Sequence, residues 1–114
     1  MRLIDKITAN AAQKITLNSD DGEEIKLYLR YLPSVESWSY ELNYKNYTVK
    51  GERLVLSPNI LRKYKNLFLF GIAIISEDGL DPSYIDDFAT GRVKLYLLSN
   101  DDKNVLENEI YEKI

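Results

Sequence analysis

Large apolar and polar side chains alternate along the first half of the chain. The segment EIKLYLRYL, residues 24–32, places Ile, Leu, Leu and Tyr on one side and Lys, Tyr, Arg and Leu on the other. The segment SWSYELNY, residues 37–44, repeats the alternation with Trp, Tyr, Leu and Tyr against Ser, Ser, Glu and Asn. A period of two residues is typical of a β-strand that is buried on one face. Only the dipeptide KN separates the second segment from YTVKG, residues 47–51, so the sequence predicts a β-hairpin there.

Further strands are predicted on both sides of this hairpin. Before it, KITLNS at residues 14–19 carries Ile and Leu on one face, and DDGEE then offers Gly22 for the positive φ of a tight turn. After it, RLVLS at residues 53–57 predicts a short strand, and RVKLYLLS at residues 92–99 alternates Val, Leu and Leu with Lys, Tyr and Leu. The run LFLFGIAIIS, residues 67–76, is apolar in both directions, which predicts a central strand covered on both faces.

Two segments between the strands predict short helical turns. In SPNILRKYKN, Ser57 is the expected N-cap and Pro58 the first helical residue. In DPSYIDDF, Asp81 and Pro82 repeat the same arrangement.

The chain reads as one β domain over residues 1–114, because no linker, repeat or change of composition divides it. Leu106, Ile110 and Ile114 are spaced four apart, as on one face of a helix. Residues 99–114 are therefore expected to form either a C-terminal helix or a tail.

The pattern as a whole predicts an all-β fold of six to seven strands with one or two short helical turns. A small antiparallel β-barrel or a sandwich would accommodate strands of this length and spacing. We expect one core that includes seven large apolar side chains. They are Leu27, Leu29, Leu42, Leu69, Ile72, Ile74 and Leu95.

Charge and hydropathy exclude two classes of partner. The net charge is −3, from 15 basic and 18 acidic side chains that form no long block of one sign. Nucleic-acid binders carry a basic patch, so no nucleic-acid partner is expected. The longest apolar run, LFLFGIAII, is too short to span a bilayer, and the first residues contain no continuous apolar core of a secretory signal. No membrane partner is expected.

The sequence offers little catalytic chemistry. It contains neither His nor Cys, which excludes catalytic triads, Cys–His pairs and the usual zinc ligand sets. Its five glycines form no phosphate-binding series. The segment SEDGLDPSYIDDF gathers five carboxylates in a spacing that fits neither an EF-hand loop nor an acid–base pair, and that is typical of a solvated loop. They are Glu77, Asp78, Asp81, Asp86 and Asp87. We predict no catalytic residue, no metal and no cofactor.

Nine tyrosines are the unusual feature of the composition. Tyrosine joins a large apolar ring to a polar tip, which suits both half-buried strands and protein interfaces. The pattern leaves both interpretations open: packing across strands, or contact with a partner protein.

The stretch LSPNILRKYKNLFLFGIAIIS and the segments around it resemble the phage baseplate plug family, small proteins of contractile tails. The resemblance runs from about residue 15 to residue 98: a hairpin rich in Leu, Tyr and Trp, this stretch, an acidic loop, and TGRVKLYLL. The positions that match the family pattern are Asn59, Ile60, Leu61, Tyr64, Gly71, Gly91, Lys94 and Leu95. The extension over residues 99–114 is longer than the pattern.

The resemblance implies a structural, non-enzymatic component of a phage or phage-like baseplate that plugs or bridges the central hub. The implied partners are other baseplate, hub or tail-tube proteins, and a homo-oligomer within the assembly is left open. The implied location is the tail baseplate of the virion, after synthesis in the cytoplasm of the bacterial host. A second interpretation of the residues is a free-standing small β-barrel module that recognises a peptide, a carbohydrate or a regulatory protein through aromatic side chains.

Residues 62–65 are the predicted interaction site. On one helical turn Leu61 and Tyr64 share a face, so Arg62, Lys63 and Lys65 are expected to point outward, where they would attract an acidic partner. The alternative is a solvated basic face with no partner.

Overall fold

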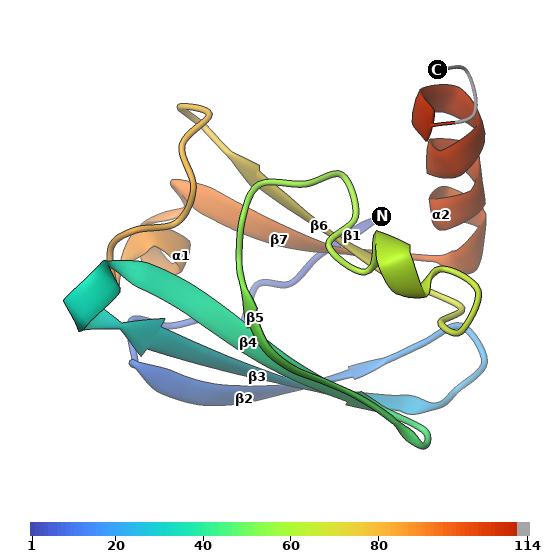
Figure 1. The fold of residues 1–114 in the computed structure, drawn as a ribbon, viewed down its shortest axis with the longest axis horizontal. Coiled ribbons are helices and arrows are strands. Elements are labelled where there is room, and N and C mark those ends of the chain that lie inside the picture. Colours follow the sequence, from blue (N-terminus) through green and yellow to red (C-terminus); the bar gives the residue numbers. More distant parts are fainter. Residues whose placement is uncertain (112–114) are drawn as a thin grey trace.

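The computed structural model describes residues 1–111 as a β-sandwich of two antiparallel sheets (Figure 1). One sheet has the order β2-β3-β4-β5 and the other the order β1-β7-β6. The strands are β1 (Arg2–Leu3), β2 (Ala12–Asn18), β3 (Glu24–Leu32), β4 (Ser37–Tyr44), β5 (Tyr47–Arg53), β6 (Gly71–Ser76) and β7 (Val93–Leu98). The prediction of an all-β fold is confirmed, and of its two alternatives the sandwich fits, because the described strands form two separate sheets.

The alternating segments form the four-stranded sheet as predicted. Leu27 on β3 lies opposite Ile15 on β2 and Leu42 on β4, and Leu42 lies opposite Val49 on β5. All four side chains are buried, because this row faces the second sheet. The period of two thus places one residue from each strand in the core at every second level.

The core fills the space between the two sheets and is rich in aromatic rings. Phe68 and Phe70 stack at 5.4 Å, and Tyr44 meets the edges of both rings. At the other end Trp38 packs edge-on against Phe88 at 5.3 Å. Six of the seven predicted core residues are buried: Leu27, Leu29, Leu42, Ile72, Ile74 and Leu95.

The prediction is wrong for the seventh core residue, Leu69, which is not buried. Its side chain is 44% exposed. The predicted strand over residues 67–76 begins only at Gly71, and in the loop before it Phe68 and Phe70 turn inward. Alternate residues of an extended chain point in opposite directions, so Leu69 between these two faces solvent.

The central position predicted for this strand is also wrong, because β7 lies between β1 and β6. The free edge of β6 is covered by residues 57–60. Ile74 N donates to Ser57 O at 2.9 Å, and Ile60 N donates to Ile72 O at 2.8 Å. The first four residues of β6 are buried, whereas Ile75 is exposed. The apolar run at residues 67–76 therefore contains an edge strand, β6, whose free edge is covered by residues 57–60.

Three other predicted boundaries are wrong. RLVLS is not a strand, because β5 ends at Arg53 and only Ser57 makes an isolated bridge to β6. Of the predicted turn from Ser57, only η2 (Arg62–Tyr64) is helical, and the later helix α1 (Asp87–Thr90) starts well beyond Asp81. Ser57 Oγ accepts from Asn59 N, as an N-cap would, but no helix begins at Pro58, and Asp81 Oδ1 accepts from the distant Leu56 N instead. A further short turn, η1 (Pro33–Val35), joins β3 to β4.

After β7 the chain forms α2 (Asn100–Leu106), which continues into η3 (Glu107–Tyr111). Ser99 caps α2 in a capping box with Asp102, in which each side chain accepts from the other residue's backbone N–H. Leu106 is half-buried and Ile110 is exposed, while Ile114 lies outside the described residues. Within residues 1–111, no helix has the length and apolar character that a membrane span requires.

Candidate protein interface

The segment that precedes η2 is anchored by Asn59. Its buried Oδ1 accepts from Leu61 N at 3.0 Å and from Ile72 N at 3.1 Å. One side chain therefore satisfies a backbone donor of its own segment and one of β6. Buried N–H groups need such partners, so Asn59 fixes the segment to the sheet.

Gly71 is the residue that lets Asn59 lie there. A Cβ atom at position 71 would lie 2.8 Å from Asn59 Oδ1 and 2.9 Å from Asn59 Cγ, which is closer than atoms tolerate. Asn59 and Gly71 are two of the positions on which the family resemblance rests. The structure thus gives a packing reason for both: the amide needs the space that glycine leaves.

The Gly71→Ala variant is expected to lose about 1–3 kcal/mol of the free energy of unfolding, as for other overpacked sites. Urea denaturation would measure the loss. In the Asn59→Ala background the same substitution should cost less, because the clashing amide is gone, and the double-mutant cycle reports that coupling. If Gly71→Ala is as stable as the parent protein, the close contact does not constrain this site.

The predicted interaction residues lie on η2 directly after this anchor. Leu61 is fully buried, and Tyr64 is half-buried with its ring 5.7 Å from that of Phe68. Tyr64 therefore packs against the edge of the core and is not wholly available to a partner.

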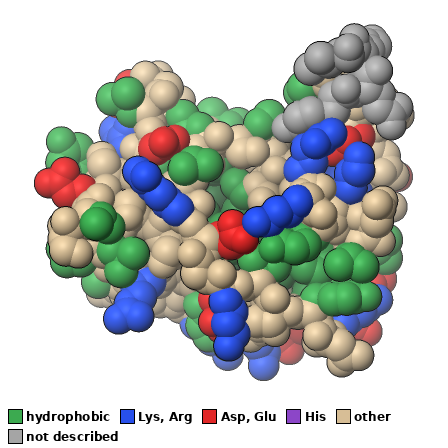
Figure 2. Space-filling model, in the orientation of Figure 1, with side chains coloured by type: hydrophobic (Ala, Val, Ile, Leu, Met, Phe, Trp, Pro, Cys, Tyr) green, Lys and Arg blue, Asp and Glu red, His purple; other side chains and the backbone are tan. Residues whose placement is uncertain are grey.

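The three cations of η2 and its C-cap each have a carboxylate partner within the chain. Arg62 Nε lies 3.1 Å from Glu107 Oε1, and Lys65 Nζ lies 3.2 Å from Glu107 Oε2. Lys63 Nζ lies 2.7 Å from Glu52 Oε1. Figure 2 shows blue and red side chains next to one another on this face. The segment is thus nearly balanced in charge.

Lys103 on α2 ties the helix to the same segment. Its Nζ donates to the carbonyl oxygens of Lys65 and Phe68, both at 2.7 Å. Burial lowers the pKa of Lys103 from the ordinary value of a lysine. Lys103 and Glu107 thus fasten the C-terminal helical segment to residues 62–68.

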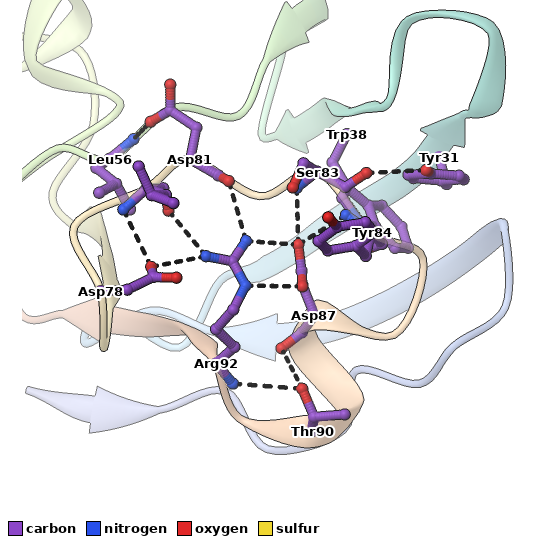
Figure 3. A network of polar contacts seen from close by, with 11 residues as sticks. Tyr31, Trp38, Leu56, Asp78, Asp81, Ser83, Tyr84, Asp87, Thr90 and Arg92 are labelled. Atoms are coloured by element: carbon purple, nitrogen blue, oxygen red, sulfur yellow. Dashed lines mark hydrogen bonds and ion pairs between the residues drawn. The ribbon is translucent and has the colours of Figure 1, made fainter.

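The acidic loop between β6 and β7 is organised by Arg92 (Figure 3). Arg92 donates from Nε to Asp87 Oδ1 at 2.9 Å and from Nη2 to Asp87 Oδ2 at 2.7 Å, a bidentate pair. Its Nη1 reaches Asp78 Oδ1 at 2.8 Å, and Nη2 also donates to the carbonyl oxygen of Asp81 at 3.0 Å. With the carbonyl oxygen of Leu80, which accepts from Nη1 at 3.3 Å, four of the loop's residues are joined through one guanidinium.

The same loop is attached to the four-stranded sheet. Asp87 Oδ2 accepts from the backbone N–H groups of Ser83 and Tyr84, at 2.7 and 2.8 Å. In turn the hydroxyl of Tyr31 donates to Ser83 O, and Trp38 Nε1 donates to Tyr84 O (Figure 3). These contacts between residues more than forty positions apart make the loop a fixed part of the sandwich.

The arrangement of Asp87 does not suit acid–base catalysis. Burial would raise the pKa of Asp87, but the hydrogen bonds from Arg92, Tyr84 and Ser83 outweigh it and lower the pKa. The carboxylate therefore stays charged, with both oxygens occupied. Among residues 1–111, no three His, Cys, Asp or Glu side chains gather as a metal site would require.

Sequence reasoning found η2 but missed its partners, Glu52, Lys103 and Glu107. Glu52 is 11 positions from Lys63, and Lys103 is 38 positions from Lys65, so no local pattern in the sequence links them. The solvated-loop interpretation is correct for Glu77 and Asp86, which are exposed, and wrong for Asp87, whose side chain is 3% exposed. The signal in the sequence for a buried, paired Asp87 was Arg92, a single arginine five residues later.

Comparison with known proteins gives one family. A family model described as "Cyanophage baseplate Pam3 plug gp18" matches residues 1–101 of the 114-residue chain. The match confirms the resemblance drawn from the sequence and extends it over the first residues of the chain. No curated protein matches the chain.

Proposed function

The chain belongs to the cyanophage baseplate plug family, and we propose on that premise that it plugs or bridges the central hub of a phage or phage-like tail. Its role is structural and is carried out through protein–protein contacts with hub, tail-tube or other baseplate proteins. The observation that carries this proposal is the family match over residues 1–101. We further propose that the chain is made in the cytoplasm of the bacterial host before it enters the tail.

The fixed loops support a structural role without catalysis. Asn59 anchors the segment before η2, Lys103 joins α2 to it, and Arg92 holds the acidic loop. A tail component has to keep its shape while several neighbours bind it, and such polar anchors preserve the shape of loops that would otherwise move. We propose that the protein has no enzymatic activity.

Purified tail particles provide the test of this role. The protein is expected in them at a constant ratio to the tube protein, measured by quantitative mass spectrometry of the particle fraction. If the particles are complete and the protein is found only in the soluble fraction, it is not a baseplate component.

We retain Arg62, Lys63, Tyr64 and Lys65 as the proposed contact with the hub. Although their charges have partners within the chain, these side chains reach the surface, and that of Lys63 is 58% exposed. A partner carboxylate could share an exposed ammonium, since surface ion pairs are weak. Lys63 is therefore the residue to test.

The Lys63→Glu variant is expected to bind a purified hub protein at least threefold more weakly at low salt, because it repels an acidic partner. The variant also places a second carboxylate beside that of the half-buried Glu52, at a cost in stability of less than about 1 kcal/mol. Arg62 is a poor choice for reversal, because Glu107 beside it is only 8% exposed. Surface plasmon resonance at two salt concentrations would measure the affinity.

Lys6→Glu is the matched control, since Lys6 is exposed and the change of charge is the same. Lys6→Glu should bind the hub like the parent protein. Equal affinities for the two variants would mean that residues 62–65 are only a solvated face.

A further inference from the structure

The outer face of the four-stranded sheet carries a concentration of basic side chains. The residues of β2 to β5 that alternate with the buried ones point away from the core. Five of them are basic: Lys14, Lys26, Arg30, Lys50 and Arg53. Two are acidic, Glu24 and Glu41, so the face is positive in a chain whose net charge is −3.

The strand register brings these side chains close together. Lys14 lies opposite Tyr28, and Tyr28 lies opposite Glu41. One level further along, Arg30 lies opposite Ser39, which pairs with Arg53. Neighbouring strands are about 4.8 Å apart, so the cations share one continuous patch. We call this patch the basic face.

The cations of the basic face differ from those of η2 and the acidic loop in having no carboxylate partner among the described residues. Lys14 Nζ lies 5.9 Å from the centre of the Tyr28 ring, a cation–π contact. Within residues 1–111, none of the five has a carboxylate within ion-pair distance, whereas Lys63, Lys65 and Arg92 each do. Their charge is therefore available to a partner.

A β-bulge makes a hollow in this face. Lys50 and Gly51 lie where β4 contributes only Glu41, and Gly51 takes a φ of +67°. Beside the bulge is a hollow of about 350 Å³, lined by Tyr28, Arg30, Ser39, Tyr40, Glu41 and Gly51. The hollow offers the guanidinium of Arg30, hydroxyls and an aromatic ring to a partner side chain, with the Glu41 carboxylate beside them.

We propose that the basic face is a second docking surface, and that its partner is an acidic protein surface whose carboxylates meet the five cations. Charge complementarity carries the proposal, because the cations have no partners within the described chain. A protein partner is favoured over nucleic acid, because an acidic protein surface can have its carboxylates away from Glu24 and Glu41, whereas phosphates repeat along the whole strand and would meet both. The proposal is independent of residues 62–65 and of the hub.

A polyglutamate peptide of about 20 residues serves as the probe, with a 20-base-pair DNA duplex as the competing polyanion. Fluorescence anisotropy would measure binding at 50 and 300 mM NaCl. The protein is expected to bind polyglutamate at 50 mM NaCl, and at least about fivefold more weakly at 300 mM, because salt screens exposed charges. The Lys26→Glu/Arg30→Glu variant is expected to lose at least about tenfold in affinity at 50 mM.

Lys6→Glu/Lys94→Glu is the matched control, because both residues are exposed outside the basic face and the net charge changes equally. It should lose less than about threefold. If the reversed variant does not fold, Lys26→Gln/Arg30→Gln replaces it, with an expected loss of at least about threefold while its own control, Lys6→Gln/Lys94→Gln, loses less.

Three results would overturn the proposal. The first is an equal loss in the face variant and its control, which indicates a general effect of net charge. The second is tighter binding of the DNA duplex than of polyglutamate, which assigns the face to nucleic acid. The third is self-association of the parent protein in analytical ultracentrifugation that the reversal abolishes, which assigns the face to a second copy of the chain.

Discussion

Replacing Arg92 by alanine is expected to lower the free energy of unfolding by about 3–5 kcal/mol, the usual cost of leaving a buried charge without its partner. The Asp87 carboxylate is buried and would keep only the two backbone donors, Ser83 and Tyr84. The contacts of Arg92 with Asp78 and Asp81 would also be lost, so the acidic loop should become mobile. Chemical denaturation at pH 7 measures the loss of stability, and hydrogen exchange measures the mobility.

Lys94→Ala is the control for this experiment, because Lys94 is two residues away, basic and exposed. It should change stability by less than about 0.5 kcal/mol. A loss below about 1 kcal/mol for Arg92→Ala would contradict the assignment of Arg92 as the organiser of the loop.

The effect of Arg92→Ala should also depend on pH. In the parent protein the pKa of Asp87 is below its unfolded value of about 3.9, so this carboxylate contributes stability above that pH, which is lost as the pH falls. Without Arg92, burial would act against fewer hydrogen bonds, and the pKa of Asp87 would rise. The difference in stability between parent and variant should therefore be larger at pH 7 than at pH 3.

Leu42→Ala is expected to cost about 2–5 kcal/mol of the free energy of unfolding, because the side chain is fully buried and its removal leaves a cavity. Leu42 lies between Leu27 and Val49 in the inner row of the sheet, where the strands leave little room to collapse. Leu69→Ala is the matched control, since the same atoms are removed from an exposed site. It should cost less than about 1 kcal/mol.

Urea denaturation of both variants would compare the two sites. Equal losses for Leu42→Ala and Leu69→Ala would mean that Leu69 is buried after all, and that the strand over residues 67–76 continues through the loop. A loss confined to Leu42→Ala would agree with a strand that begins at Gly71.

The half-buried strands were predictable because their signal is local. In β3 and β4 large apolar and polar side chains alternate, so inward and outward positions can be told apart. Leu27 and Leu42 could therefore be assigned to the core from the sequence alone. Residues 67–76 carried no such signal, because apolar side chains occur on both sides of the run. The sequence therefore does not tell which of them point inward. The inward turn of Phe68 and Phe70 depends on their contacts with Tyr44, which is more than twenty residues away.

The candidate interface was predictable in composition but not in its contacts. The sequence placed three cations around Tyr64, yet their partners Glu52 and Glu107 come from β5 and from the helical segment after α2. The basic face on the outside of the sheet could not be recognised in one dimension, because its cations are spread over three strands, β2, β3 and β5, and alternate with core residues. Only the strand register brings them together.

The most direct test of the central claim is a cryo-electron microscopy reconstruction of the tail particle that contains this protein. A structural plug predicts density for the seven-stranded sandwich on the axis of the baseplate, in contact with hub or tail-tube proteins. The result that would contradict the claim is a baseplate resolved at side-chain detail in which the axial position is filled by another protein and this sandwich is absent.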